Sequence, residues 1–451
     1  MSPNLEGVDI FGMSNPLAIA ENVTQENSNY GFLGNIEANY NVWKSLKLST
    51  LFGLRFNKER ERIFLPGIGI AYDTLSTAIV TNKSQHRVER IFSLSNETRA
   101  NYVHKFSHDN MLDMTLGFRY QNNKAEDDWG KGYNSVSDNF TSINYGLNTL
   151  RQVGGSLGTW NWLAYYANVN YSYKNKYFVS ATTSFDASSR YGESISQYQV
   201  YPFLSAAWVL SSESFMKGVK AIEFLKLRAG YSLTGNDDIG NYTARYYYVP
   251  QNILGNYGLI RGNIVNTNLK PERNAKLYLG LDAALWNERL SFSLDAYRTK
   301  ISDMITNSPV SPISGFSTYI SNGGEMKNTG IDFSVNARLI NTTSWKWDVG
   351  ANVSFYKNEI ISLQGGESYK TSIADAIIIT QEGSPLGLFY GYKTDGVYST
   401  EAEANVAGLY HMSGANKLKF GAGDIRFVNS NDDDLIDEND MTVIGDPNPD
   451  I

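Results

Sequence analysis

The chain has 451 residues with a formal net charge of -7, and it contains 30 Tyr, 21 Phe and 39 Gly but no Cys. The missing Cys excludes disulfides and thiolate metal sites, and the acidic balance without a basic run argues against a nucleic-acid partner. No stretch approaches the roughly 18 consecutive apolar residues of a membrane-spanning helix, so only strands remain as a way to cross a membrane.

The chain divides into three expected regions. The opening residues MSPNLEGVDIF have neither a cationic start nor an apolar core, so we expect no export signal here. Residues 1–30 are interpreted as an N-terminal segment that leads into the first strand, residues 31–359 as barrel strands with long extracellular loops, and residues 360–451 as an extracellular loop region.

Strand-like stretches fill most of the chain. Their length exceeds the mode of about 5–6 residues in soluble sheets, and it suffices for the roughly 9–11 residues of a tilted strand that crosses a bilayer, with several strands projecting beyond it. Twelve strands are predicted, at residues 31–41, 45–57, 88–105, 110–124, 161–173, 176–188, 199–211, 222–233, 274–286, 289–303, 327–340 and 344–359.

Alternation separates two faces on these strands. Within residues 275–300, one set of alternate positions is uncharged from Leu277 to Ala296 and the other is mixed, and the hairpin at residues 327–359 repeats the pattern. A repeat of two residues indicates strands whose two faces differ in character. A soluble β-sandwich gives the same pattern, because it buries one face of each sheet and exposes the other to water. The uncharged set comprises Leu277, Leu279, Leu281, Ala283, Leu285, Leu290, Phe292, Leu294 and Ala296, followed by Ile331, Phe333, Val335, Ala337 and Leu339.

The links between strands alternate in length. The short links NVWKS, KFSHDN, YKNK, WNER and INTTS alternate with long ones near 58–87, 125–160, 189–198, 234–273 and 304–326, whereas the link at 211–221 is longer than its short peers. Outer-membrane barrels have tight periplasmic turns and long extracellular loops. Strand length and this asymmetry together predict an all-β protein, a large antiparallel transmembrane β-barrel with uncharged positions toward lipid.

Four tryptophans lie beside the short turns: Trp43, Trp286, Trp345 and Trp347. We interpret them as part of an aromatic girdle at the periplasmic interface. The alternative is that they cap the core of a soluble sheet.

An acidic stretch near the C-terminus has the spacing of a twelve-residue calcium loop. Asp434 stands where that motif has Gly, and an amide replaces its usual first Asp, so a solvated acidic turn is the alternative. A Ca2+ site is predicted from the oxygen side chains at positions 1, 3, 5, 9 and 12, which are Asn429, Asn431, Asp433, Asp437 and Asp440.

Catalytic motifs are missing from the sequence. Its four histidines form no H-E-x-x-H pair, and no G-x-S-x-G elbow is present, so we do not expect an enzyme. Aromatic loop residues could stack on sugar rings, but loop packing explains them equally, and no substrate-binding residue is assigned. These aromatic residues are Trp129, Tyr133, Tyr145, Tyr246, Tyr247 and Tyr248.

Several longer motifs resemble the SusC/RagA-like branch of TonB-dependent outer-membrane transporters. They include LKLRAGYSLTGNDDIGNY, NTNLKPERNAKLYLGLDAAL, SGFSTYISNGGEMKNTGIDFSVNARLI, EGSPLGLFYGYKTDGVYS and GDIRFVNSNDDDLIDENDMTVIGDPNPD, and the likeness runs from about Asn15 onward. The resemblance implies a 22-stranded barrel around a plug domain, a SusD-like surface lipoprotein as lid, and import of oligosaccharides or peptides powered by the TonB complex.

The chain departs from that pattern because it shows neither plug nor TonB box, and twelve strands leave about ten unaccounted for. An open sheet in lipid would expose unpaired backbone groups, so we expect either a piece of a longer polypeptide, which we favour, or a chain that closes a barrel with separately encoded partners. The leading hypothesis is import across the outer membrane. The alternatives are a scaffold barrel without transport and, less favoured for want of catalytic residues, a surface hydrolase.

Overall fold

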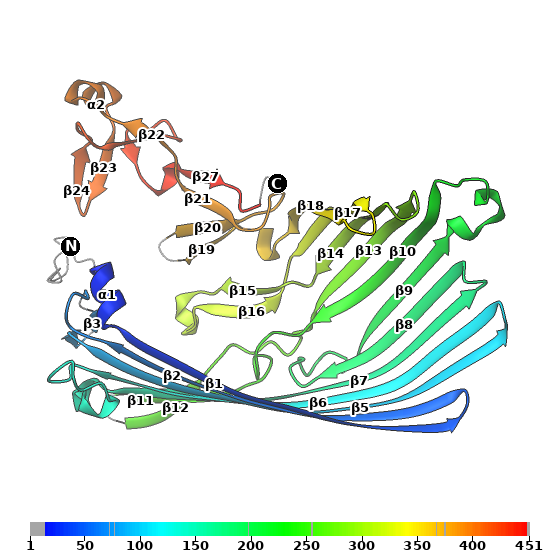
Figure 1. Ribbon diagram of the computed structural model, residues 1–451. Coiled ribbons are helices and arrows are strands. Elements are labelled where there is room, and N and C mark those ends of the chain that lie inside the picture. The colour runs from blue at the N-terminus through cyan, green and yellow to red at the C-terminus, as the bar shows by residue number, and fades with distance from the viewer. Residues whose placement is uncertain are drawn as a thin grey trace.

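One antiparallel sheet of twelve long strands dominates the structure, a computed structural model that describes residues 14–71, 73–75, 77–196, 198–253, 256–366, 368–373 and 376–448. Each long strand pairs with the long strands before and after it in the chain (Figure 1). The strands are β1 (Thr24–Trp43), β2 (Leu46–Leu65), β5 (Lys83–Ser107), β6 (Asn110–Tyr133), β7 (Gln152–Tyr173), β8 (Tyr177–Ser188), β9 (Gln199–Val209), β10 (Ile222–Asn236), β13 (Glu272–Leu285), β14 (Leu290–Ser302), β17 (Glu325–Asn341) and β18 (Lys346–Ser362).

All twelve predicted strands are confirmed, but several extend further at the long-loop end. β1 begins at Thr24 instead of residue 31, β5 begins at Lys83 instead of 88, and β6 continues to Tyr133 instead of 124. Polar side chains lie on both faces of these extensions, so the alternation that marks a strand disappears there. Residues 1–13 and 449–451 of the expected terminal regions lie outside the described residues.

Smaller elements gather at the long-loop end (Figure 1). The helix α1 (Pro16–Asn22) precedes β1, and three small hairpins pair β3 (Asp73–Leu75) with β4 (Ala78–Val80), β11 (Tyr248–Ile253) with β12 (Asn256–Arg261), and β15 (Ile305–Pro309) with β16 (Thr318–Asn322). In the described ranges, no helix combines the length and the apolar character needed to cross a membrane.

The region after β18 folds into small sheets, which we call the loop-end lobe (residues 368–448). Two backbone hydrogen bonds attach this lobe to the end of β18. The Ile360 amide donates to the Ser384 carbonyl, and the Gly383 amide donates to the Ile360 carbonyl. Its elements are β19 (Tyr369–Ile373), β20 (Ala376–Thr380), β21 (Leu388–Tyr392), β22 (Thr394–Val397), α2 (Glu401–Ala407), β23 (Tyr410–Ser413), β24 (Asn416–Lys419), β25 (Ile425–Phe427), β26 (Leu435–Ile436) and β27 (Met441–Gly445).

The strand register sorts side chains onto two faces. Leu281 lies opposite Leu294, which lies opposite Phe333, so the apolar positions form continuous rows on one face. These rows are open to the surroundings, with Leu279 59% and Phe355 55% exposed. A contiguous exposed apolar surface of this kind requires a nonaqueous neighbour.

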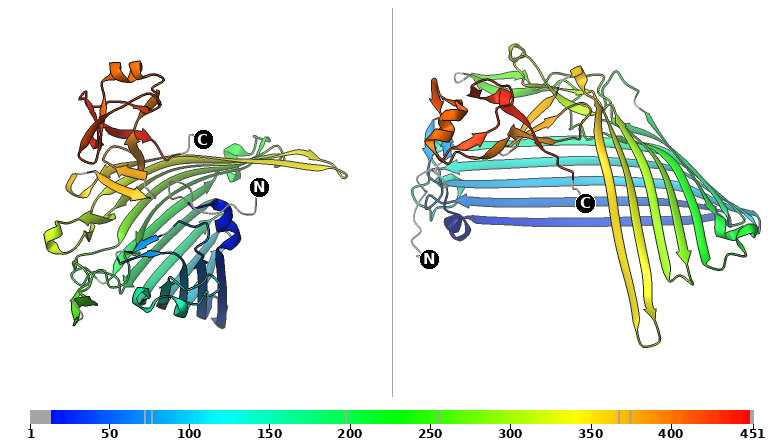
Figure 2. Two further views of the ribbon diagram at one scale, coloured as in Figure 1. Left: turned by 90° about the vertical axis from the view of Figure 1, so that its left-hand side faces the viewer. Right: turned by 90° about the horizontal axis from the view of Figure 1, so that it is seen from above.

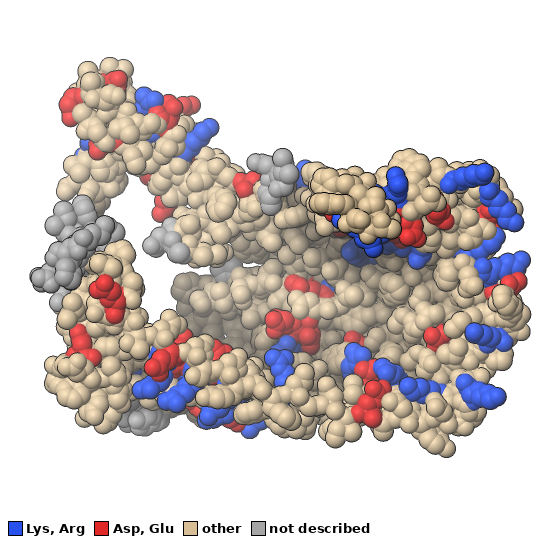
Figure 3. Space-filling view, viewed as in Figure 1, with Lys and Arg blue, Asp and Glu red and all other residues tan. Residues whose placement is uncertain are grey.

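The sheet is strongly curved and open. Figure 2 shows a trough with β1 and β18 at its two edges, which do not pair with each other. The space-filling view shows acidic and basic side chains inside the hollow (Figure 3). The curvature therefore places the polar face inside and the apolar face outside.

Aromatic residues line the outer face beside the short turns. Trp43 is 57% exposed, Trp286 is 54% exposed and Trp345 is 73% exposed, so these indoles do not cap a buried core. The Tyr177 ring stacks between Tyr173 and Trp208, with centroids 6.1 Å and 6.2 Å away. This arrangement is what the girdle interpretation requires.

The longer link after β9 has a structural role at this end. Glu213 accepts hydrogen bonds from the Tyr177 hydroxyl at 2.7 Å, Trp208 Nε1 at 3.1 Å and Lys176 Nζ at 3.1 Å. These bonds, with Tyr177 contributing most, lower the pKa of Glu213 to about 2. The extra residues therefore connect the girdle aromatics to the turn between β7 and β8.

We predict that Leu281→Arg destabilises the barrel by about 2–4 kcal/mol, because it places a charge at the middle of the lipid-facing row. The matched control is Ser334→Arg on the inner face, where water solvates the guanidinium. Urea unfolding of the barrel in lipid vesicles measures both. Equal losses for the two variants would contradict the assignment of the faces.

We predict that Glu213 stabilises the fold in a pH-dependent manner. Its pKa in the folded chain lies below the ordinary value of 4.5, so its contribution is complete above that value and disappears as the pH falls toward 2. The thermal midpoint of Glu213→Gln should therefore lie below that of wild type at neutral pH and converge with it in acid. Glu288, in a neighbouring turn, forms no side-chain hydrogen bond or ion pair in the described part of the chain, and Glu288→Gln should show no such convergence.

Candidate functional site

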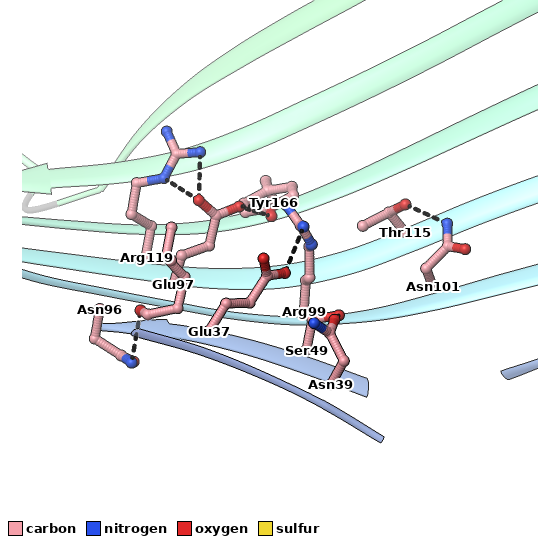
Figure 4. Close-up of polar contacts among 11 residues, drawn as sticks. Glu37, Asn39, Ser49, Asn96, Glu97, Arg99, Asn101, Thr115, Arg119 and Tyr166 are labelled. Carbon is pink, nitrogen blue, oxygen red and sulfur yellow. Dashed lines mark hydrogen bonds and ion pairs between the residues drawn. The ribbon is translucent and has the colours of Figure 1, made fainter. Parts of the chain in front are cut away.

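The inner wall of the trough carries the polar features that can meet a solute. Register brings Glu97 opposite Arg119 and Arg99 opposite Gly117, while Glu37 approaches from β1. We call Glu37, Glu97, Arg99, Arg119 and Tyr166 the inner charge cluster (Figure 4).

Glu97 is the centre of this cluster. Its Oε2 accepts from Arg119 Nε at 3.2 Å and Nη2 at 3.0 Å, and its Oε1 accepts from the Tyr166 hydroxyl at 2.5 Å. Arg99 forms ion pairs with Glu97 at 3.8 Å and with Glu37 at 3.4 Å. Only 16% of the Glu97 side chain is exposed. In the folded chain, these hydrogen-bond donors therefore replace much of the water that would solvate the carboxylate.

Glycine makes room for the aromatic side chain of the cluster. A Cβ on Gly117 would lie 2.1 Å from the Tyr166 ring, so only a residue without a side chain lets this ring lie flat on the wall. The Arg119 guanidinium lies 5.8 Å from the centroid of Tyr166 and 6.0 Å from that of Trp162. Ring and cation thus hold each other in fixed positions.

A second cluster lies on the inner face of β10, β13 and β14. Arg228 binds Asp282 through Nε at 2.7 Å and Nη2 at 2.9 Å, and its Nη2 also reaches Asp295 at 3.0 Å. The Ser293 hydroxyl donates to Asp282 at 2.8 Å. Arg228 therefore links two carboxylates from neighbouring strands, and Lys226 lies directly opposite one of them, Asp282.

A groove of about 470 Å³ runs along the inner wall beside the inner charge cluster. The Arg190 guanidinium covers the face of Trp160 at 4.4 Å, at one side of this groove. Amide and hydroxyl groups alternate here with aliphatic ones, which suits a polar organic solute and supplies no nucleophile with an adjacent base. Its lining includes Leu33, Asn35, Arg55, Ile91, Ser93, Ser95, Gln121, Asn123 and Trp160.

The loop aromatics occupy different environments. Tyr133 is 3% exposed and packs with Val80 and Leu150, so its role is to hold loops together. Tyr246 and Tyr248 remain 66% and 61% exposed. Of the six aromatic candidates, the structure thus assigns Tyr133 to a loop core.

The remaining three candidates are placed as follows. Trp129 lies on β6 under Lys131, with Nζ 5.2 Å from the ring centroid. Tyr145 packs against Phe140 at 4.9 Å, and Tyr247 lies close to Gly262. None of these contacts identifies a solute site.

The acidic turn of the loop-end lobe uses its oxygens mainly on backbone amides. Asp440 is fully buried and accepts from the Ser430 amide at 2.8 Å and the Asp437 amide at 2.9 Å, while Asp437 accepts from the Asn439 amide at 2.8 Å. Among the described residues, no group of three or more His, Cys, Asp or Glu side chains converges as a metal site.

The other three predicted ligands also take part in the turn. Asn431 accepts from the Asp433 amide at 3.1 Å, and Asp433 accepts from the Leu435 amide at 2.7 Å. The Asn429 side-chain amide donates to the Asp433 carbonyl, and its Oδ1 is buried without a hydrogen-bond partner in the described ranges. The calcium site stays a prediction.

The four histidines lie apart in the fold and in different settings. His86 accepts from Arg60 at 3.2 Å, His104 packs edge-on to Phe106, His108 is fully exposed beside Asp109, and His411 packs on Phe420. Sequence reasoning singled out none of the residues of the two inner clusters. Their charged side chains occupy the inward-facing alternate positions of the strands. The sequence does not show which of these side chains become partners, because that depends on the register between neighbouring strands.

Comparison with known proteins gives one matching family. Residues 10–433 match the family described as TonB dependent receptor-like, beta-barrel. The TonB-dependent receptor P39 of Formosa agariphila is 29% identical and aligns with 96% of this chain, and the TonB-dependent receptor SusC of Bacteroides thetaiotaomicron is 31% identical over 46% of it. The chain spans only 44% of P39 and 21% of SusC.

A solved structure has the same fold. The structure of the RagAB peptide transporter matches with a TM-score of 0.72 at 23% identity, covering 84% of this chain and 42% of that chain. At this identity, the likeness shows the architecture of the barrel wall.

We predict that Glu97→Gln destabilises the barrel by about 1–3 kcal/mol, because it leaves Arg119 and Arg99 with weaker acceptors on the wall. The control is Glu59→Gln, since Glu59 lies on the same face, accepts from Asn27 at 2.8 Å and has no ion pair in the described part of the chain. Thermal unfolding in detergent measures both changes. A loss no larger than that of the control would show that the cluster is not a structural unit.

We predict that the acidic turn binds Ca2+ and that Asp433→Asn/Asp437→Asn abolishes the binding heat in calorimetry on the whole chain, because two anionic ligands are lost. Asp395→Asn is the control, since Asp395 belongs to the same lobe but pairs with Arg426 at 3.2 Å. Unchanged heat in the double variant would remove the site.

Proposed function

The chain belongs to the TonB-dependent receptor-like β-barrel family, and on that premise we propose that it forms part of an outer-membrane barrel that imports nutrients. The resemblance of its motifs to this family is thereby confirmed, and the family consists of transporters and receptors, not enzymes. Because the chain spans less than half of the relative P39, import, substrate and partners are all inferred for a larger assembly.

The observation that carries the proposal is the sorting of side chains by the curved sheet. Rows such as Leu281, Leu294 and Phe333 face outward, whereas Asp282, Ser293 and Ser334 form the neighbouring row that faces inward. A wall that is apolar outside and wet inside suits a channel through lipid. A soluble sandwich would cover the apolar rows with a second sheet.

The open edges support a barrel closed by further strands. β1 and β18 each pair on one side only in the described residues. In hydrocarbon, each unpaired backbone group costs several kcal/mol, so both edges require partners. A closed barrel would also turn the inner clusters toward a lumen.

We propose an oligosaccharide or a peptide as substrate and a SusD-like surface lipoprotein as partner. The likeness of this chain to a receptor named SusC and to the RagAB peptide transporter supports this proposal. The groove is lined by amides, hydroxyls and the Trp160 ring, which can bind either class of solute. A plug energised by the TonB complex would open the lumen.

The proposed import is tested by narrowing the groove in the native bacterium. Ser95→Trp adds bulk to the inner wall of β5, and the control Thr98→Trp adds the same bulk to the lipid-facing side of the same strand. Uptake of labelled oligosaccharide and peptide mixtures should fall for Ser95→Trp and stay at the wild-type level for the control, because only the inner wall meets solute.

A deletion strain completes this experiment. Deleting the gene should abolish uptake of at least one of these classes, and a surface lipoprotein should co-purify with the wild-type barrel. Full uptake in the deletion strain, together with loss of an outer-membrane complex, would instead support a scaffold.

A further inference from the structure

A group of cations lies on the outer face, above the apolar rows. The neutral outer positions of β2 run from Leu48 to Phe56, which matches the roughly 9–11 residues that a tilted strand needs to cross hydrocarbon. The next outer positions on β2 are Lys58, Arg60 and Arg62, and Arg90 faces Lys58 from β5. We call Lys58, Arg60, Arg62 and Arg90 the outer basic rim.

The location of this rim follows from the strand topology. It lies at the long-loop end of β2 and β5, which is the extracellular side of an outer-membrane barrel. Its side chains begin where the neutral positions end, so they stand at the level of lipid headgroups. This placement rests on the outer-membrane location in the proposed function.

The rim carries cations that the protein leaves unneutralised. Lys58 and Arg90 lie directly opposite each other, a like-charge pair that costs stability in a sheet. Arg62 meets Glu26 only at 3.9 Å, and Arg60 donates to the neutral acceptor His86. In the described ranges, neither Lys58 nor Arg60 forms an ion pair with a carboxylate.

Nearby acids offset only part of this charge. Arg90 pairs with Glu126 at 3.3 Å and Asp128 at 3.4 Å, but Glu126 also pairs with Lys124 at 2.6 Å. Glu126 is therefore shared between Arg90 and Lys124, and among the described residues neither Glu126 nor Asp128 pairs with Arg60.

A pocket of about 220 Å³ opens at the rim. Arg60, Arg62 and His86 line it together with Glu26. The apolar walls of the pocket are supplied by Phe64 and Ile143. Phe64 is only 6% exposed, and Ile143 belongs to a loop that packs on Gly132. Two guanidinium groups beside apolar surface suit an anionic group that is attached to hydrocarbon.

We propose that the outer basic rim binds the phosphate of a phosphorylated glycolipid headgroup in the outer leaflet. Guanidinium groups bind phosphate through paired N–H donors, and a phosphate would offset the repulsion between the rim cations. The acyl chains would lie on the outer faces of Phe56 and Phe52 directly below. A carboxylate headgroup would offer less charge to the same cations.

The opposite side of the sheet offers a matched control. On the outer face of β14 and β17, Lys300 pairs with Glu325 at 2.9 Å and Lys327 pairs with Glu359 at 3.1 Å. These lysines stand at the same end of the sheet, but each already has its own carboxylate. They therefore do not need a lipid anion.

The test is the retention of lipid by protein purified from native outer membranes in mild detergent. Mass spectrometry should find phosphorylated glycolipid bound to wild type and to Lys300→Gln/Lys327→Gln. In Arg60→Gln/Arg62→Gln, the bound amount should fall about tenfold, because charge-assisted bonds to phosphate are lost. Equal retention in this variant would overturn the proposal.

A second measurement does not depend on the variants folding. Wild type in nanodiscs should melt at a higher temperature with bisphosphorylated lipid A than with the dephosphorylated lipid. Equal melting with both lipids, or the same stabilisation by inorganic phosphate alone, would overturn the lipid site, and the latter would indicate a free-phosphate site. Lipid retention needs no transport, so failure of import and failure of this site are distinguishable.

Discussion

Backbone hydrogen bonding between neighbouring strands is the constraint on which the rest of the structure depends. In hydrocarbon no water replaces a missing partner, so every long strand between β1 and β18 pairs with a long strand on both sides. Once register is fixed, a period of two assigns every side chain to one face. The apolar rows, the wet inner wall and the need to close both edges all follow from this pairing.

The inner wall shows what register does to polar residues. Charges that are distant in sequence become neighbours, as Arg119 pairs with Glu97 and Arg228 pairs with Asp282. Gly117 then leaves space for the Tyr166 ring beside them. The result is a smooth, firmly held wall with polar groups available to a solute, which fits passage through a lumen better than chemistry at a centre.

The outer face carries different kinds of residue at different levels along the strands. Exposed aromatics such as Trp43 and Trp286 lie at the short turns, neutral rows follow, and charged residues begin at the long-loop end. Along this end, the two sides of the sheet differ: Lys300 and Lys327 each pair with a carboxylate, whereas Arg60 pairs with none among the described residues. The loop-end lobe extends from the same end, so lipid, solute and partner proteins would all meet the barrel there (Figure 1).

The sequence by itself determined the strands that cross the apolar zone, because one uncharged face leaves an alternation that can be read locally, as in Leu277 to Leu285. It also indicated the family and the asymmetry of the turns. The extension of β5 back to Lys83 left no such pattern, since both of its faces are polar. Only the tertiary structure brought Glu97 to Arg119 and Tyr166, or left Arg60 without an ion pair to a described carboxylate. Cross-strand neighbours depend on register, and register is set by the pairing of whole strands, not by any local run of residues.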